Sequence, residues 1–209
     1  MGVTMKPIVL ATHNKAKLRD LMQGFEPLTK HGYTIHTLSE FNIADEPEET
    51  GKTFQENALL KARYYADRCG MAAIADDGGL TIDALNGEPG VYSRRWTGHT
   101  ASDEELIAYT LERMKDIPEE KRSAHMGTCL CFYDPSTQKH MTVTESIKGT
   151  ISRVANPSWT KGYPYRAVFM VDEYKTYYDN LTAKQHARIN HRLKAIAKLI
   201  EMLDHSQHA

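Results

Sequence analysis

The chain has 209 residues, of which 41% are hydrophobic and 25% are charged, and its net charge is −1 at pH 7. This length suits one sizeable domain or two closely packed lobes, and the balanced charge argues against broad binding to nucleic acid or to an anionic membrane. No apolar run reaches the roughly 20 residues that span a bilayer, and the amino terminus lacks the apolar core of a signal peptide. Three cysteines, two of them in a C-x-C pair, fit a reducing compartment better than a disulfide framework, so we expect a cytosolic protein.

The predicted strands are short apolar or alternating runs bounded by polar residues. Six such runs cover residues 7–12, 33–38, 71–75, 124–133, 140–147 and 167–171. Runs 124–133 and 140–147 flank Asp134-Pro135-Ser136-Thr137, which predicts an antiparallel hairpin. On one of its strands, Cys129 and Cys131 share a face, where we interpret them as small hydrophobic residues.

The predicted helices follow from helical spacing and capping residues, and cover residues 15–24, 53–69, 102–114 and 182–203. In the first, Leu18, Leu21 and Met22 lie on one stripe. The second begins with a capping box of Thr53 and Glu56. Gly70 ends that helix, Ser102 caps the third, and the last carries Ile189, Leu193, Ile196, Ile200 and Leu203 at helical spacing.

The order of these elements predicts the fold class. Strands and helices alternate early in the chain, and the hairpin follows in the middle. This mixture predicts an α/β fold with a long central mixed sheet flanked by helices, and suggests two lobes around a cleft. Trp96 and Trp159 are expected to be packing residues, and His205 and His208 to be solvated on a polar tail.

The most informative stretch is Ala75-Asp76-Asp77-Gly78-Gly79-Leu80. An apolar run that ends in two carboxylates and two glycines predicts a buried strand with acid groups at its carboxyl end, followed by a turn. Such oxygen ligands suit a hard divalent cation, and a water-activating base could also lie there. The alternative is an acidic hairpin turn, because Asp-Gly and Gly-Gly are common turn formers, and the motif alone fits that turn better.

Residues 11–17 lie at a predicted strand-to-helix junction, where backbone N–H groups and the positive end of a helix favour phosphate. Thr12 and Asn14 could donate hydrogen bonds, and Lys17 could supply charge one turn later. The segment is not a Walker A loop. The other interpretation, which the residues leave equally open, is an N-cap by Asn14 followed by a solvated lysine-rich face.

Residues 48–58 bring two carboxylates to the start of the second helix, on which Asn57 and Lys61 share a face. A carboxylate from this loop and Asp77 could hold one magnesium ion, which commonly takes one or two protein carboxylates and leaves its other positions to water and phosphate. Taken alone, the loop fits a different interpretation better, in which its acidic side chains lie near a helix N-terminus because the helix dipole favours negative charge there.

Together these segments resemble a known family. ATHNKAKLRDL, EETGKTFQENALLKA, ADDGGL and PGVYSRRW, followed by His191-Arg192 near the carboxyl end, occur in the order and spacing of the inosine triphosphate pyrophosphatases, also called noncanonical purine NTP pyrophosphatases or XTP/dITP diphosphatases. The resemblance covers nearly the whole chain and implies one domain over residues 1–209. It implies a homodimeric, Mg²⁺-dependent α/β enzyme with a substrate cleft between two lobes.

The resemblance also implies an activity, which is hydrolysis of the α–β phosphoanhydride of a nucleoside triphosphate to the monophosphate and pyrophosphate. It implies Asp77 as general base and metal ligand, with Asp76 and Lys17 in the catalytic group. Further metal ligands would be Glu48 and Glu49. The implied phosphate-side residues are Thr12, His13, Asn14, Lys15, Lys17, Lys61 and Gly78. The implied base-side residues are Tyr163, Tyr165, Arg166, His186, His191 and Arg192.

The chain departs from the family pattern mainly on the base side. Gly78 replaces a serine, and a backbone N–H could still serve there. In the segment 161–167, Pro164 replaces a glycine, and Arg166 stands where the family has Asp, which exchanges an acceptor for a donor array and reverses the charge. His186 and Asn190 replace a lysine and a serine. Three functions follow: a pyrophosphatase for noncanonical purine triphosphates, the same cleavage with a shifted base specificity, or a nucleotide-binding protein without turnover.

Overall fold

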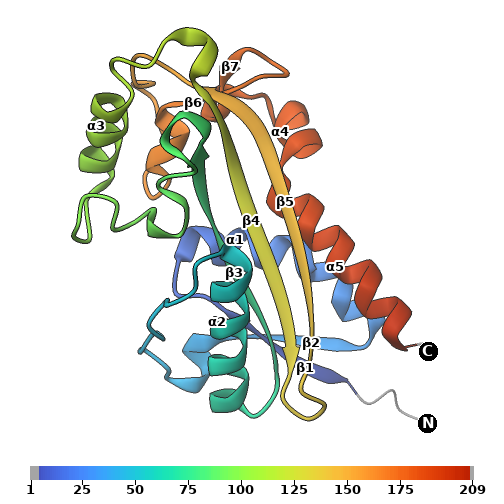
Figure 1. The fold of residues 1–209 in the computed structure, drawn as a ribbon. Coiled ribbons are helices and arrows are strands. Elements are labelled where there is room, and N and C mark those ends of the chain that lie inside the picture. The colour runs from blue at the N-terminus through green and yellow to red at the C-terminus, as the bar shows by residue number, and fades with distance from the viewer. Residues whose placement is uncertain (1–4, 208–209) are drawn as a thin grey trace. The chain divides into compact units, whose positions relative to one another are not determined.

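The computed structural model describes residues 5–207, and side chains up to residue 205, so His208 lies outside the described residues. The described part contains one seven-stranded sheet in the order β2-β1-β3-β4-β5-β6-β7 (Figure 1). Its strands are β1 (Lys6–Ala11), β2 (Tyr33–Thr37), β3 (Ala72–Ile82), β4 (Ser123–Asp134), β5 (Lys139–Ile151), β6 (Phe169–Val171) and β7 (Thr176–Tyr177). Strand β1 pairs in parallel with β2 and β3, whereas β6 pairs antiparallel with β5 and β7, which confirms the mixed sheet.

The helices are α1 (Lys15–Phe25), α2 (Phe54–Cys69), α3 (Asp103–Arg113), α4 (Ala183–Ile189) and α5 (His191–Gln207). The predicted capping box of Thr53 with Glu56 is confirmed, as is the end of α2 at Gly70, which has a φ of 65°. Ser102 caps α3 as predicted. No helix in the described part of the chain is long and apolar enough to cross a membrane.

The chain divides into two compact units, each described here by itself. Unit 1 comprises the chain up to Asp77, Thr128–Glu145, and the chain from Arg192 onward. Unit 2 comprises Gly78–Gly127 and Ser146–His191.

Unit 1 has a core on each face of its part of the sheet, because successive residues of a strand point to opposite faces. Ile8 and Leu10 of β1 pack in one core with residues of α1 and α5. Val9 and Ala11 pack in the other core with residues of α2. Cys129 and Cys131 are free cysteines buried in this second core, so the prediction that they share a face is confirmed.

Strand β3 corrects the interpretation of the Asp-Asp-Gly-Gly motif. The strand continues without a break from Ala72 to Ile82, so Asp76 and Asp77 lie in its middle, and neither the predicted turn after a strand end nor the alternative hairpin turn is present. Gly79 serves a close approach instead of a turn. A Cβ at Gly79 would clash with Ser93 Oγ and would lie 3.1 Å from the Gly90 carbonyl oxygen.

Unit 2 is built around one apolar core, to which Leu80, Ile82, α3 and β6 contribute. Trp96 and Trp159 pack against this core, which confirms them as packing residues. Arg122 is 1% exposed and donates hydrogen bonds to the carbonyl oxygens of Met114, Ile117, Ile151 and Ser152. One buried guanidinium therefore joins the end of α3 to the end of β5.

The prediction of one helix over residues 182–203 is wrong. Helix α4 ends at Ile189, Asn190 has a ψ of 107°, and α5 begins at His191. The apolar residues on the two sides of this break serve different cores: Ile189 packs in the core of unit 2, and Ile196 packs in a core of unit 1. Helical spacing alone does not reveal that change of partner.

Three smaller expectations are also settled. Met22 is 42% exposed, because the buried stripe of α1 continues from Leu21 to Phe25. The strand predicted over residues 167–171 is shorter, since Ala167 belongs to a 3-10 helix, Pro164–Ala167. His205 lies in α5 and is exposed as expected.

Candidate active site

The N-terminus of α1 is capped by its own sequence. Asn14 Oδ1 accepts hydrogen bonds from the backbone N–H groups of Ala16 (2.9 Å) and Lys17 (3.1 Å), which confirms the predicted N-cap but not the solvated lysine-rich face expected after it. Thr12 Oγ1 accepts from the Asn14 N–H at 3.2 Å. Lys15 is exposed, whereas Lys17 is not. The cap therefore leaves one lysine of the junction in solvent and directs the other into the protein.

His13 is partly buried, and its ring meets the ring of Tyr65 edge-on, with 5.8 Å between the centroids. Its Nε2 atom is buried and has no hydrogen-bond partner among the described residues.

Lys17 belongs to a charged group that we call the Lys17 cluster, made of Lys17, Asp20, Asp76, Thr128 and Arg192. Asp76 Oδ2 lies 3.4 Å from Lys17 Nζ and accepts a hydrogen bond from Arg192 Nε at 3.0 Å. Asp76 Oδ1 accepts from Thr128 Oγ1 at 2.5 Å. Arg192 Nη1 donates to Asp20 Oδ2 at 3.2 Å. Strand alternation places Asp76 on the face of the sheet that carries α1 and α5, which supply these cations.

Asp77 points to the other face, towards α2, and forms a second group that we call the Lys61 cluster. Lys61 Nζ donates to Asp77 Oδ1 at 3.0 Å and to Glu49 Oε1 at 2.8 Å. Asp77 Oδ2 is buried and has no hydrogen-bond partner within residues 5–207. The cluster thus presents one carboxylate oxygen that is ready to accept a proton or a cation.

The two adjacent carboxyl groups differ in acidity because their surroundings differ. Burial alone would raise the pKa of Asp76, but the positive charges of Lys17 and Arg192 and the Thr128 hydrogen bond hold it well below its usual range. For Asp77, burial raises the pKa above its usual range in spite of the charge of Lys61. Asp77 is therefore the better proton acceptor, and Asp76 remains an anion.

The two lysines also differ. Burial lowers the pKa of Lys17, which Asp76 only partly offsets. Burial would lower the pKa of Lys61 as well, but the charges of Asp77 and Glu49 outweigh it and raise that pKa. Lys61 is consequently fully charged at neutral pH.

The predicted metal ligands come only partly together. Glu49 and Asp77 share Lys61, whereas Glu48 is exposed. Within the described residues no group of three His, Cys, Asp or Glu side chains is arranged to hold a metal ion. Magnesium usually takes only one or two protein carboxylates, so the free Asp77 oxygen with Glu49 nearby fits such an ion.

Asn57 fixes the loop that carries these carboxylates. It is fully buried, its Oδ1 accepts from the Gly51 N–H at 2.8 Å, and a Cβ at Gly51 would lie 2.5 Å from that oxygen. Helical spacing placed Asn57 on the same face as Lys61 but did not predict this role for it. Asp20 and Thr128 were missed altogether: Asp20 lies within the quoted segment 11–21 but was given no role there, and Thr128 belongs to no motif.

In unit 2, the segment around Arg166 is organised by aromatic rings. The Arg166 guanidinium carbon lies 3.7 Å from the ring centroid of Tyr163 and 4.6 Å from that of Tyr178, and Nη1 lies 3.7 Å from Asp179 Oδ1. His186 meets the Tyr178 ring edge-on. Three of the predicted base-side residues, Tyr163, Arg166 and His186, thus form one group with Tyr178 and Asp179, which sequence reasoning missed.

The other predicted base-side residues lie elsewhere. Tyr165 is buried in the unit 2 core, and its hydroxyl donates to the Ser93 carbonyl oxygen at 2.5 Å. His191 belongs to unit 2 and is 5% exposed. Arg192 belongs to unit 1 and to the Lys17 cluster. Gly78 is partly buried within β3.

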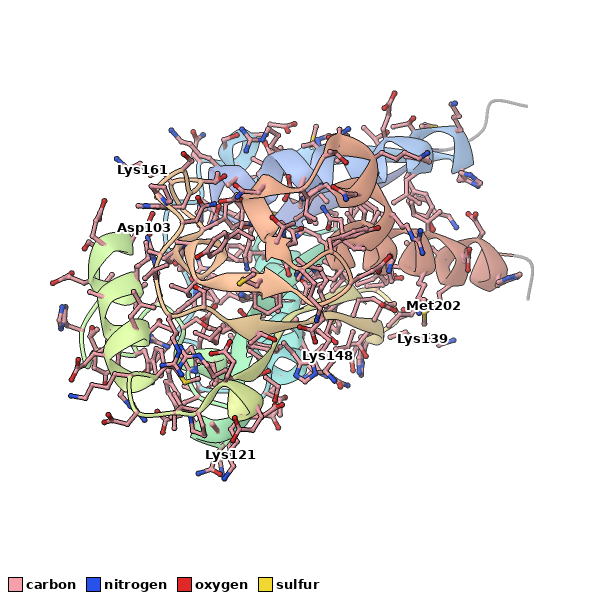
Figure 2. The ribbon with its side chains drawn as sticks, turned by 90° about the horizontal axis from the view of Figure 1, so that it is seen from above. Asp103, Lys121, Lys139, Lys148, Lys161 and Met202 are labelled. Carbon is pink, nitrogen blue, oxygen red and sulfur yellow. The ribbon has the colours of Figure 1, made fainter. Side chains whose placement is uncertain are left out.

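Asp103, at the first position of α3, ties the base-side segment to its surroundings within unit 2 (Figure 2). Its Oδ2 accepts from the Gly162 N–H at 2.6 Å, and its Oδ1 accepts from Arg94 Nη1 at 2.6 Å. The side chain is 7% exposed. The segment is therefore also held through a main-chain atom, in addition to the side-chain contacts of Arg166.

Comparison with known proteins agrees with this fold and identifies the family. The Ham1 family matches residues 8–202. The chain is 35% identical over 202 residues to the dITP/XTP pyrophosphatase of Bacillus subtilis, covering 97% of this chain and 99% of that relative. It is 41% identical over 195 residues to the dITP/XTP pyrophosphatase of Thermus thermophilus, covering 93% and 90%.

A solved structure gives the same result for the fold. A HAM1 protein from Coxiella burnetii superposes with a TM-score of 0.84 at 32% identity, covering 95% of this chain and 98% of that one. The resemblance inferred from the motifs is thereby confirmed, and this chain belongs to the Ham1 family.

Proposed function

We propose that this chain hydrolyses noncanonical purine nucleoside triphosphates, such as ITP, dITP and XTP, to the monophosphate and pyrophosphate. The observation that carries the proposal is Asp77 Oδ2, a buried and unpartnered carboxylate oxygen whose neighbouring oxygen binds Lys61. It occurs in a chain that belongs to the Ham1 family and resembles dITP/XTP pyrophosphatases over nearly its full length.

In this mechanism Asp77 is the general base. Its Oδ2 accepts a proton from a water molecule, and the oxygen of that water attacks phosphorus while the bond between the α and β phosphates breaks. The electron pair of that bond leaves with pyrophosphate. The raised pKa of Asp77 suits proton acceptance, and Lys61 orients its other oxygen.

Lys17 and Lys61 are the cations that bind the triphosphate in this proposal. A triphosphate resists attack by water until its charge is neutralised, and a fixed ammonium group does this without reorganisation. Asp77 and Glu49, with Glu48 at the edge of the same loop, would hold magnesium, which when bound neutralises the phosphate charge and activates the attacking water.

The base-side group supports a second candidate, which is the same cleavage with a shifted base specificity. Arg166 packs between Tyr163 and Tyr178, so one face of each ring is in contact with a cation. Arg166 Nε is buried without a hydrogen-bond partner in the part of the chain that the structure describes. A guanidinium with an unused donor favours a base that offers an acceptor.

We further propose that residues 1–209 form a single catalytic domain that acts as a cytoplasmic homodimer on a small-molecule substrate. The dimer follows from the family resemblance. The compartment is supported by Cys69, Cys129 and Cys131, which are all free cysteines.

Pyrophosphate release from a panel of triphosphates, with Mg²⁺ and with EDTA, tests the proposal. The panel comprises ITP, dITP, XTP, the standard NTPs and dNTPs, and triphosphates of modified bases. Selective, Mg²⁺-dependent release from ITP, dITP and XTP would support the first candidate, and selectivity for another base would support the second. Nucleotide binding without release from any member would contradict both.

A further inference from the structure

The loop that precedes α2 is bound to one face of that helix. It comprises residues 42–52, and we call it the acidic loop because Asp and Glu side chains are frequent in it. The α2 residues that bind it recur every three or four positions, so they lie on the same side of the helix. The pairs are Asn57 with Gly51, Lys61 with Glu49, and Tyr65 and Arg68 with Asp45. Since the loop number falls as the helix number rises, the loop runs antiparallel to α2.

The attachment at Asp45 has a buried part and an exposed part. The Tyr65 hydroxyl donates to the Asp45 carbonyl oxygen at 3.2 Å, and Tyr65 itself is 2% exposed. The Tyr64 hydroxyl donates to Asp45 Oδ2, and Arg68 Nη2 lies 3.0 Å from the same oxygen. These latter contacts lie in solvent, because the Asp45 side chain is 54% exposed, and exposed ion pairs contribute little to stability. The Tyr65 hydrogen bond is therefore the attachment that matters most at this end of the loop.

Glu49 lies between the attachments at Asp45 and Gly51. Its Oε1 accepts from Lys61 Nζ, which also donates to Asp77 Oδ1. A loop that is fixed on both sides of Glu49 keeps this carboxylate close to Asp77. A loop that is fixed only at Gly51 would let it move away, and a small displacement is enough to weaken a site built from few ligands.

We propose that Tyr65 is a positioning residue for the acidic loop: through the Asp45 carbonyl oxygen it fixes the loop on α2, and thereby fixes Glu49 beside Asp77. This inference rests on the proposed function, in which Glu49 and Asp77 hold magnesium. Because Tyr65 acts through a main-chain atom of the loop, its hydroxyl affects the dependence on magnesium and affects every triphosphate equally, whatever base it carries.

The test removes the hydroxyl and keeps the ring. Tyr65→Phe loses the hydrogen bond to Asp45 and retains the ring that meets His13 edge-on. Tyr177→Phe is the matched control, because the Tyr177 hydroxyl also donates to a loop carbonyl oxygen, that of Val154 at 2.8 Å, but in unit 2. A third variant, Asp45→Ala, removes the exposed part of the attachment and leaves the Tyr65 hydrogen bond in place.

Two quantities are measured for each variant. The first is the Mg²⁺ concentration that gives half-maximal pyrophosphate release from saturating ITP. The second needs neither metal nor turnover. It is the rate at which a protease that cuts after glutamate cleaves the native protein at Glu46 or Glu48, both in the acidic loop, with the fragments identified by mass spectrometry.

We expect Tyr65→Phe to raise the half-activating Mg²⁺ concentration about three- to tenfold, with kcat restored by excess Mg²⁺. Cleavage in the acidic loop should also be about three- to tenfold faster, because the loop opens more often without the hydrogen bond. Asp45→Ala should act in the same direction by a smaller factor, and Tyr177→Phe should resemble the wild type. Unaltered Mg²⁺ dependence or unaltered cleavage in Tyr65→Phe, or a loss of kcat that excess Mg²⁺ does not restore, would overturn the inference.

A Tyr65→Phe protein that does not fold leaves the decision to Asp45→Ala, in which unaltered Mg²⁺ dependence and cleavage would contradict the proposal. If the wild type hydrolyses no triphosphate, the proposed function fails, but proteolysis still tests whether Tyr65 fixes the loop. Faster cleavage in Tyr65→Phe than in the wild type and Tyr177→Phe would then support the inference, and equal cleavage of all three proteins would overturn it.

Discussion

The residues of unit 1 that we propose for the phosphates and the residues of unit 2 that we propose for the base are held in place by different forces. In unit 1, Asp76 and Asp77 each pair with cations from helices, so every side chain fixes another. In unit 2, the segment around Arg166 is held by a hydrogen bond of the Gly162 N–H, by the buried Tyr165, and by contacts of the Arg166 guanidinium with aromatic rings. We expect a substitution at Tyr163 or Arg166 to change base recognition, whereas one at Asp76 or Asp77 would disrupt a charge network.

Asp77→Asn is expected to have the largest effect. Because an amide cannot accept the proton of water, turnover should fall by about 10²- to 10⁴-fold while nucleotide binding remains measurable. Pyrophosphate release and calorimetric binding of ITP would be compared with those of Asp67→Asn, an exposed control on α2. Normal turnover by Asp77→Asn would contradict the proposal that Asp77 is the general base.

Asp76→Asn should instead reduce stability, by about 3 kcal/mol at pH 7, because it removes the carboxylate charge beside the buried Lys17 and leaves Arg192 with Asp20 as its remaining carboxylate of the cluster. The pKa of Asp76 is lowered by folding, so its stabilising contribution is present above its unfolded pKa of about 3.9 and is lost as the pH falls below that value. Urea unfolding at pH 7 and at pH 3 should therefore show a smaller difference between wild type and variant at pH 3. Asp77 is present in both proteins, so its own contribution to the pH dependence of stability cancels in the difference between them. An equal difference at both pH values would contradict the proposed pairing.

Gly79→Ala tests the backbone packing of unit 2. The added Cβ would clash with Ser93 Oγ, and we expect a loss of about 2 kcal/mol in the free energy of unfolding. The double variant Gly79→Ala with Ser93→Gly removes the obstructing atoms and should recover part of that loss. Additive effects of the two substitutions would show that the close approach does not limit position 79.

Arg166→Ala should have the smallest effect and should sharpen the comparison. We expect the ratio of kcat/KM between ITP and the standard purine triphosphates to change about tenfold, with tripolyphosphate binding unaltered. Arg188→Ala, an exposed arginine of the same unit that pairs with Glu173, is the control. If tripolyphosphate binding weakens instead, Arg166 acts on the phosphates, and the division between the two sides fails.

The sequence predicted the fold class and most elements because capping residues and strand alternation are local signals. Thr53, Glu56 and Gly70 determine the ends of α2 without help from distant residues. The break at Asn190 was not predictable from spacing, since it arises where the chain exchanges one core for another. The Asp-Asp-Gly-Gly motif suggested a turn because its local pattern does not reveal contacts with distant residues. Only the approach of Ser93 shows why Gly79 lacks a side chain.

The candidate site was predictable for residues that lie within the recognised motifs. Lys17, Lys61 and Asp77 were found from their segments, and the structure places Asp77 beside Lys61. Asp20 and Thr128 were not found, because each acts through a partner that is distant in sequence; Asp76 and Thr128 are 52 positions apart. Such contacts are set by packing, which leaves no local pattern.

The unbroken course of β3 sets a length constraint on this chain. Asp76 and Asp77 serve opposite faces only because they are consecutive in a strand whose pairing with β1 fixes its register. Deleting or inserting one residue between Ala72 and Asp76 would exchange the two faces, and each carboxylate would meet the other's cations. The motif can therefore vary by substitution, as Gly78 shows, but its spacing from the start of the strand cannot change by a single residue.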